Sequence, residues 1–502
     1  MGPDFRSPDP PGTRAYLADD QPTSLVAANI PGGEAQRIVQ GLDIPGQWWA
    51  VFHSRPLNDM IERSLAANPD IQAAQASLRA AQANARAQRA TLFPTVQAGF
   101  GASQNQVSTV LSPPTASGDF IYSLFTLGVT VSYTLDLFGA NRRSIESLEA
   151  LAEAQCFQLE AAYLSLASNV VAAAVQEASL RAQIDATQRI VAAQRETLDI
   201  LRRQEGLGAV TGADVAQQEA ALAQAQATLP PLQKALAQGR NLLITLTGQT
   251  PDVRLAEQFE LSDLTLPADL PLSLPSQMVE QRPDIRAAEA NLHSASALVG
   301  VAVANQFPQI TLTAGITPTS LGLDTFFMPG LLNSVAGTSV LQTIVDGGAL
   351  AAKKRAAQAN LEQAAAQYRS TVLTAFRNVA DTLRALEYDA ISLQAAVTAE
   401  RASANSLNIA RRRLELGDTT YVVVLAAELT YRQALLNRVQ LQSNRLTNTA
   451  ALFQSLGGGW WSRPDQQANP AQRATCRPPR PGTAPATAPA TAPAAPDVQA
   501  RR

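Results

Sequence analysis

The sequence predicts an α+β protein made of two copies of one unit, in which very long helices are combined with a few amphipathic strands. Three observations lead to this prediction. The chain repeats itself, residues 141–205 and 349–416 contain neither proline nor glycine, and short segments before them alternate apolar with polar residues. Uninterrupted runs of this length indicate long helices, and a period of two indicates strands with one apolar face.

Composition excludes several classes of protein. A net charge of −3 and a pI near 5.7 argue against a nucleic-acid binder held by a basic surface. Two histidines and two cysteines leave little material for a metal site or a catalytic triad. The motifs Gly-x-Ser-x-Gly, His-Glu-x-x-His and Gly-Lys-Ser/Thr are missing from the sequence. We therefore expect no enzymatic activity, no cofactor and no nucleic-acid partner.

The internal repeat rests on several markers that keep nearly constant offsets along the chain. The matching pairs of segments are 68–78 with 282–292, 135–139 with 344–348, and 208–248 with 417–457. The predicted organisation is an extended, Pro/Gly/Asp-rich arm, a first repeat, a linker, a second repeat and a disordered Pro/Ala-rich tail. Their predicted bounds are 1–47, 48–248, 249–275, 276–461 and 462–502.

Each repeat is predicted to open with a short helix at a Pro-Asp pair, Pro69-Asp70 or Pro283-Asp284. Proline suits the first turn, and an aspartate favours the positive helix end. Strands follow each helix. The four predicted strands surround Val96–Phe100, Val129–Leu135, Ile310–Ile316 and, least clearly, Val335–Val345.

The long helix of each repeat comes next and spans roughly 100 Å at 1.5 Å per residue. A turn with glycine ends it, at 206–212 in the first copy and 416–420 in the second. One returning helix of about 36 residues is then expected to run to Gly248 or Gly457. The opening and returning helices together match the long helix in length, so we expect them to stack end to end along it.

Four strands cannot close on themselves, and open sheet edges are not tolerated in lipid. Small closed barrels need at least eight strands, so a membrane sheet would have to be shared by two or more chains. The pattern alone does not choose between a dimer and a trimer. A soluble sandwich would show the same alternation.

The residues that carry a resemblance to a known family are distributed over both repeats. They are Trp48–Phe52, Asn68–Asp70, Leu135–Gly139, Arg282–Glu289, Val345–Gly348 and Leu456–Trp460. In order and spacing the chain resembles the outer membrane factor family of TolC and OprM type, most closely its NodT-like lipoprotein branch.

The resemblance implies a homotrimer with a twelve-stranded transmembrane β-barrel in the outer membrane and a periplasmic α-helical barrel. It implies an exit duct of a tripartite efflux pump, which conducts small toxic compounds passively. The implied partners are a periplasmic adaptor and an inner-membrane transporter of RND type. Two alternatives remain open: a duct for type I protein secretion, and a soluble coiled-coil scaffold.

The start of the sequence departs from the lipoprotein pattern of that family. Lipidated relatives carry a cysteine shortly before Gly-Pro-Asp-Phe, whereas here Gly2–Phe5 follows Met1 directly. The sequence also shows no basic segment followed by an apolar segment, as a signal peptide would have. We expect that a signal peptide and a lipid-bearing cysteine are missing from this sequence.

The resemblance places the turns after the long helices at the periplasmic tips, where an adaptor would dock. The candidate docking residues are Gly206, Gly208, Thr211, Gly212, Gly417, Asp418 and Thr420. Glycine permits close backbone approach to a partner; a plain helix C-cap would use it equally well.

Many relatives narrow the tunnel near the tips with rings of acidic residues. Ala426 stands at the position where relatives often carry Asp, so the candidates for such a ring are Asp214 and Asp418. Repeated by threefold symmetry, either would attract cations. The alternative is a solvated carboxylate in the first turn of a helix.

Basic residues follow two of the strands, at the predicted start of each long helix. They are Arg142, Arg143, Lys353, Lys354 and Arg355. Cations at a helix N-terminus oppose the helix dipole and need compensation. Phosphates of outer membrane lipid are one source of it, and salt bridges within the protein are the other.

Overall fold

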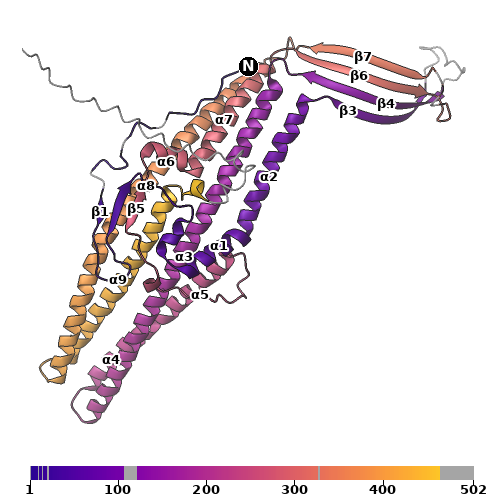
Figure 1. The fold of residues 1–502 in the computed structure, drawn as a ribbon. Helices are drawn as coiled ribbons and strands as arrows, with labels where there is room; N and C mark the ends of the chain where they lie inside the picture. The colour runs from indigo at the N-terminus through magenta and orange to yellow at the C-terminus, as the bar shows by residue number, and fades with distance from the viewer. Residues whose placement is uncertain are drawn as a thin grey trace, which may run out of the picture.

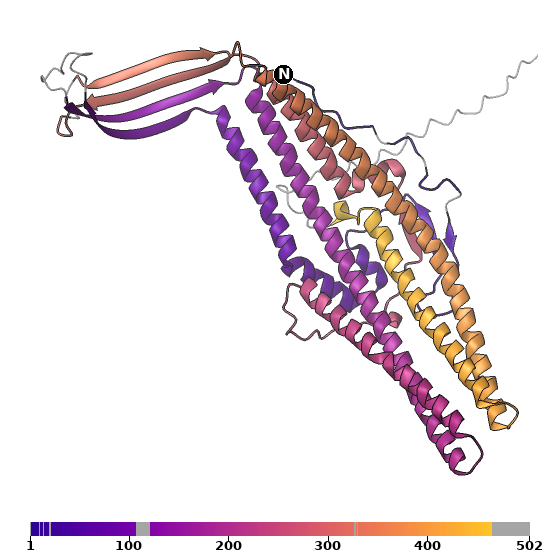
Figure 2. The same ribbon diagram turned by 180° about the vertical axis from the view of Figure 1, so that it is seen from behind.

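The computed structural model describes residues 2–463 except 10, 14, 20, 21, 107–120, 326, 327 and 329. It shows a bundle of long helices from which one four-stranded sheet projects sideways at one end (Figures 1 and 2). None of the helices in the described part is both long enough and apolar enough to cross a membrane. The predicted tail 462–502 lies outside the described residues from 464 onward.

The projecting sheet contains one hairpin from each repeat, in the order β3-β4-β6-β7. Its strands are β3 (Thr95–Gln106), β4 (Ile121–Leu135), β6 (Gln309–Ser320) and β7 (Leu332–Leu341). All neighbours are antiparallel, and β4 joins the two hairpins by pairing with β6. The outer edges of β3 and β7 have no partner strand in the described part of the chain.

The helices of the two repeats correspond one to one at the start. The first repeat has α1 (Arg55–Ala67), α2 (Pro69–Arg89) and α3 (Ala140–Gly206); the second has α6 (Pro275–Gln281), α7 (Pro283–Ala304) and α8 (Ala349–Glu415). Both long helices, α3 and α8, contain 67 residues, which confirms the predicted long helices. In both repeats the shorter helices pack end to end along the long one (Figure 1).

The returning helix differs between the repeats, and the prediction of one continuous helix is wrong for the first. There the structure has α4 (Gly212–Ala227) and α5 (Leu229–Leu246), separated at Thr228. Pro230 and Pro231 explain the break, because proline lacks an amide hydrogen and clashes with the preceding turn. The second repeat has no proline there and forms a single helix, α9 (Tyr421–Ser455).

The arm and the linker contain more structure than the sequence suggests. Strands β1 (Ser24–Leu25) and β2 (Gln36–Gln40) of the arm join β5 (Asp269–Leu272) of the linker in a small sheet beside the helices (Figure 1). The parallel pairing of β2 with β5 ties the two segments together. The fourth predicted strand also shifts: β7 begins at Leu332 and ends at Leu341, before Val345.

The main core lies at mid-height, where the two repeats meet. Trp48 and Phe453 are buried and stack with ring centroids 5.6 Å apart. Equivalent contacts close each repeat there. The side chain of Asn68 donates to the Leu246 carbonyl (3.1 Å), and that of Arg282 donates to the Ser455 carbonyl (2.7 Å). The residue before each Pro-Asp pair therefore anchors the end of the returning helix.

Candidate functional site: hairpin tips, helix junction and sheet faces

The two helical hairpins end far from the sheet, in tips of nearly identical geometry (Figure 1). In the α3–α4 tip Gly208 has φ +75°, and in the α8–α9 tip Gly417 has φ +74°. Each αL glycine lets the chain reverse while its amide satisfies a carbonyl of the last helical turn. The leucine before each glycine points into solvent: Leu207 is 85% and Leu416 is 81% exposed.

The N-terminus of α4 has a side-chain cap, whereas that of α9 does not. Thr211 and Asp214 form a reciprocal capping box at the start of α4, in which the Asp214 carboxylate accepts from the Thr211 amide (3.0 Å) and hydroxyl (2.6 Å). These hydrogen bonds lower the pKa of Asp214. Thr420, at the corresponding place before α9, makes no side-chain cap. Gly206 and Gly212 border the first tip, and a Cβ at Gly206 would meet nothing.

Asp418, the other candidate for an acidic ring, has a partner on its own chain. Its carboxylate accepts from Arg413 Nε at 2.8 Å, and its carbonyl accepts from the same guanidinium. Ala426 is exposed on α9. Asp214 and Asp418 thus lie on different tips, and each has a local partner.

One buried hydrogen bond joins the two hairpins near their tips, and the sequence did not single out its residues. Tyr421 of α9 donates its hydroxyl to the Gln218 side chain of α4. Gln218 donates in turn to the Gln194 carbonyl of α3 at 2.7 Å. Tyr421 and Leu425 are buried among apolar residues of α3 and α4.

Each hairpin also carries one ion pair at an equivalent position. Arg202 binds Glu219 at 2.6 Å in the first repeat, and Arg411 binds Glu428 at 2.8 Å in the second. Glu219 and Glu428 are aligned by the sequence repeat, so their shared role was detectable as a matched pair. The pairs hold the returning helix against the long helix just above each tip.

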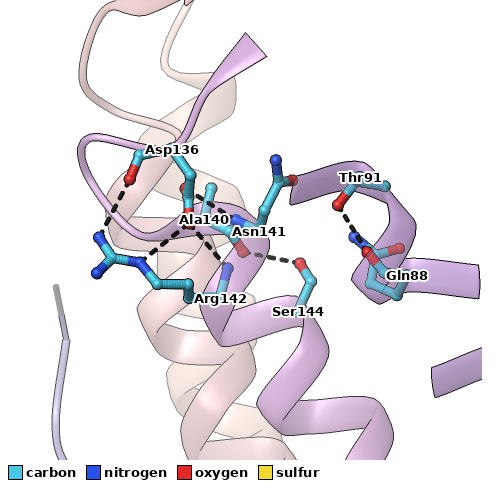
Figure 3. Close-up of polar contacts among 7 residues, drawn as sticks. All are labelled: Gln88, Thr91, Asp136, Ala140, Asn141, Arg142 and Ser144. Atoms are coloured by element: carbon cyan, nitrogen blue, oxygen red, sulfur yellow. Dashed lines mark hydrogen bonds and ion pairs between the residues drawn. The ribbon is translucent and has the colours of Figure 1, made fainter. Parts of the chain in front are cut away.

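A carboxylate caps the start of each long helix just after the preceding strand, and Figure 3 shows the one at α3. Asp136 accepts from the amides of Asn141 (3.0 Å) and Arg142 (2.9 Å) and from Arg142 Nε (3.2 Å). In the second repeat Asp346 accepts from the amides of Gly348 (2.8 Å) and Leu350 (2.6 Å). These bonds lower the pKa of Asp346, that from Leu350 most strongly. Both motifs selected from the sequence therefore act as helix caps.

The predicted basic residues at this junction fall into two groups. Arg142 is compensated by Asp136, and Arg143 binds both Glu146 (2.7 Å) and Asp4 of the arm. Lys353, Lys354 and Arg355 of α8 form no ion pair with any described residue. The first group thus has its counter-charge within the chain, and the second has none among the residues that the structure describes.

The two faces of the sheet have opposite character. Register places Val96, Val131 and Ala314 in one row and Phe100 beside Leu127, all on the same face. Nothing in the described chain covers this apolar face: Val96 is 67%, Ile316 50% and Val340 61% exposed. The opposite face carries mainly hydroxyl and amide side chains, and Thr134 and Thr311 share a hydrogen bond across strands (3.2 Å).

A groove of about 840 Å³ lies between α3, α8, α9 and the arm. Four of its charged side chains form ion pairs within the groove, Arg438 with Glu400 (2.9 Å) and Arg189 with Asp185 (2.7 Å). Among the described residues no cluster of three or more His, Cys, Asp or Glu could hold a metal. The groove therefore presents balanced ion pairs rather than a reactive group.

Comparison with known proteins agrees with this architecture. The family described as outer membrane efflux protein matches residues 60–249 and 274–458. The toluene efflux pump outer membrane protein TtgC of Pseudomonas putida is 30% identical over 463 residues, covering 91% of this chain and 94% of that protein. The pyoverdine export outer membrane protein OpmQ of Pseudomonas aeruginosa is 29% identical over 420 residues, covering 83% and 88%.

A solved structure extends the likeness to the fold. The outer-membrane channel OprN superposes with a TM-score of 0.80 at 28% identity, covering 92% of this chain and 99% of that one. Long helical hairpins and a four-stranded sheet per chain are thus features shared with a channel rather than an enzyme. The fold, both repeats and the relatives agree: the chain belongs to the outer membrane efflux protein family, the TolC-type channels of Gram-negative outer membranes.

Proposed function

We propose that the chain is the passive exit duct of a tripartite efflux pump and works as a homotrimer. The observation that carries this proposal is the sheet: two edges without partners, one exposed apolar face and one polar face. A backbone edge left open in lipid is costly, so β3 of one copy pairs with β7 of the next. Three copies give a closed twelve-stranded barrel with a water-filled lumen, since eight strands only just leave room for side chains.

The hairpin tips are the proposed docking site for a periplasmic adaptor. Leu207 and Leu416 offer six exposed leucines per trimer, each followed by a glycine that leaves the backbone accessible. Covering exposed apolar side chains of this kind with a partner removes them from water and stabilises the complex. An inner-membrane transporter of RND type would supply the energy, because the sequence contains no phosphate-binding motif.

The acidic ring remains part of the proposal in a restricted form. Asp214 accepts a hydrogen bond from the Thr211 hydroxyl, and Asp418 forms an ion pair with Arg413. Arg413 offsets the charge of Asp418, so Asp214 is the stronger candidate for attracting cations. Asp214→Asn should reduce cation over anion permeability in a planar bilayer, whereas Asp418→Asn should change it less. The reverse ranking would contradict this assignment.

The basic triplet Lys353–Arg355 is proposed to face outer membrane phosphates. It lies just beyond β7 and has no counter-charge in the described chain, whereas Arg142 has Asp136. The triple change of Lys353, Lys354 and Arg355 to glutamine should weaken trimer insertion into vesicles with anionic lipid and not into neutral ones. Equal insertion of the variant into anionic and neutral vesicles would contradict the proposed contact with lipid phosphates.

Deletion and complementation test the function itself. Loss of the gene should increase sensitivity to organic solvents or antibiotics in a strain without a redundant duct, and the wild-type gene should restore resistance. The printed names of the relatives include both toluene and pyoverdine, so several compounds should be tried. Unchanged sensitivity together with loss of a secreted protein would favour type I secretion. A soluble monomer would favour the scaffold.

A further inference from the structure

The described strands of the sheet contain no side chain that carries a charge at neutral pH. Within β3, β4, β6 and β7, as the structure describes them, no residue is Asp, Glu, Lys, Arg or His. Charge returns at both ends of the sheet. Asp324 follows β6 at the outer end, and the Asp136–Arg142 pair follows β4 at the helix end. The uncharged zone therefore coincides with the strands.

The polar face can be assigned residue by residue from the strand register, which pairs Thr130 with Gly315 and Thr313 with both Ser132 and Gly337. Most of its side chains are hydroxyls and carboxamides, and the apolar exceptions are Leu124, Val335 and Leu341. The polar ones are Thr95, Gln97, Ser103, Asn105, Tyr122, Thr126, Thr130, Ser132, Thr134, Gln309, Thr311, Thr313, Thr317, Thr319, Asn333 and Ser339.

Every glycine of the four strands lies on this same face. They are Gly99, Gly101, Gly128, Gly315 and Gly337. A Cβ placed at Gly99 or Gly337 would meet nothing within 4 Å. These two glycines thus do not serve close packing within the described chain; they leave their own positions on the polar face without a side chain.

The chemistry of such a face treats the two signs of charge alike. A hydroxyl or carboxamide donates a hydrogen bond to an anion and accepts one from a cation or an ammonium group. Fixed charges are what make a pore select by sign, because they set up a potential inside low-dielectric walls. A wide lumen also lets a solute keep its water shell, so no strong contact is needed for passage.

We propose that the outer-membrane section of the duct is a charge-neutral passage, lined by hydroxyls, carboxamides and glycines, that takes cationic, anionic and uncharged solutes alike. Discrimination by charge, where the assembled pump shows it, then arises below the strands. This inference rests on the proposed trimeric duct, in which the polar face lines the lumen.

A single-cysteine reporter tests the inference in intact trimers. Thr313→Cys places a thiol on the polar face, and Val129→Cys places one on the apolar face as the control. Trimers in vesicles are treated with a trimethylammonium-ethyl or a sulfonatoethyl methanethiosulfonate. Each rate is divided by the rate of the same reagent with free cysteine. The chain without added cysteine gives the background rate of each reagent.

The assay needs a demonstration that it senses fixed charge. Ser132 lies directly opposite Thr313, so Ser132→Asp adds a carboxylate beside the reporter, and Ser132→Asn is the neutral match. The aspartate variant should increase the normalised preference for the cationic reagent several-fold, and the asparagine variant should not. Both variants are first checked for trimer formation, and a variant that fails is replaced by Thr130→Asp with Thr130→Asn.

The outcomes separate the inference from the function beneath it. We expect both reagents to modify Thr313→Cys at normalised rates within about twofold of each other, while Val129→Cys stays protected. A preference of about tenfold or more for either sign at Thr313 would overturn the neutral passage and leave the duct intact. Modification of Val129→Cys with protection of Thr313→Cys would instead overturn the orientation of the sheet and with it the proposed duct.

Discussion

At the scale of single residues, two carboxylates determine where the sheet ends and the helical body begins. Asp136 and Asp346 stand at equivalent places in the two repeats, and each accepts hydrogen bonds from amides of the following helix. Those amides have no partner within the helix, so a carboxylate satisfies them and complements the positive helix end. Asp136 also neutralises Arg142, which would otherwise oppose the dipole.

Replacing Asp136 should loosen the start of α3. Asp136→Ala removes the acceptor of two helix amides and the partner of Arg142, a loss of about 1–2 kcal/mol locally. We expect the amides of Asn141 and Arg142 to exchange hydrogen about tenfold faster, measured by mass spectrometry on the intact protein. Asp59→Ala, on the exposed surface of α1, is the matched control. Equal exchange in both variants would show that Asp136 does not cap the helix.

The cap at Asp346 should give a defined pH dependence. Amide hydrogen bonds lower its pKa in the folded chain below the ordinary value of 3.8, so the carboxylate stabilises the fold above that pH. The stabilisation is complete from about pH 5 upward and fades as protonation approaches the lowered pKa. The gap in exchange rate at Leu350 between wild type and Asp346→Asn should therefore narrow in acid. If the difference in exchange rate became larger as the pH falls, the lowered pKa of Asp346 would not stabilise the helix start.

At the scale of elements, the repeat made most of the architecture predictable. Proline-free and glycine-free runs marked α3 and α8, and the Pro-Asp pairs marked α2 and α7, because backbone chemistry alone determines these features. The break between α4 and α5 follows from Pro230 and Pro231, a local signal that the comparison of the two repeats does not show, because α9 has no proline there. The small sheet of β1, β2 and β5 was not predictable, since two-residue and five-residue strands form only through long-range pairing.

The candidate site was predicted less completely. The tip glycines and the pair Glu219 and Glu428, which the repeat aligns, can be identified from the sequence alone. The Tyr421–Gln218 contact was not, because it joins residues far apart in sequence and neither belongs to a motif. A tyrosine beside three valines could have signalled a position where a hydroxyl matters.

Removing that hydroxyl should separate the hairpins near their tips. Tyr421→Phe keeps the ring in its apolar pocket and leaves the buried Gln218 oxygen without a donor, which costs about 1–3 kcal/mol. Amides 418–424 should exchange faster, and single-channel recordings should show longer or larger openings. Tyr388→Phe removes a hydroxyl from a side chain that is 60% exposed and should change neither measurement. Faster exchange without a change in conductance would confine Tyr421 to a structural role.

At the scale of the whole molecule, the two ends face different environments. The sheet exposes one apolar face and two open edges, whereas the opposite end of the helices exposes single leucines beside glycines. The first surface suits lipid and further copies of the chain; the second suits a protein partner that binds and leaves. The equal length of α3 and α8 keeps both tips at a similar distance from the sheet, so the proposed trimer would present six tips at one level to the proposed adaptor.

Adjacent residues of β4 allow the sheet orientation to be tested within one strand. Val129 lies on the apolar face and Thr130 on the polar face. A lysine on a lipid-facing strand position costs about 2–4 kcal/mol near the membrane midplane, whereas a lumen position tolerates it. Val129→Lys should therefore reduce trimers in outer membrane fractions strongly, and Thr130→Lys should leave their amount near wild type while shifting conductance toward anions. Trimer loss in Thr130→Lys alone would mean that the apolar face, not the polar one, lines the interior, and no closed duct of this kind could then form.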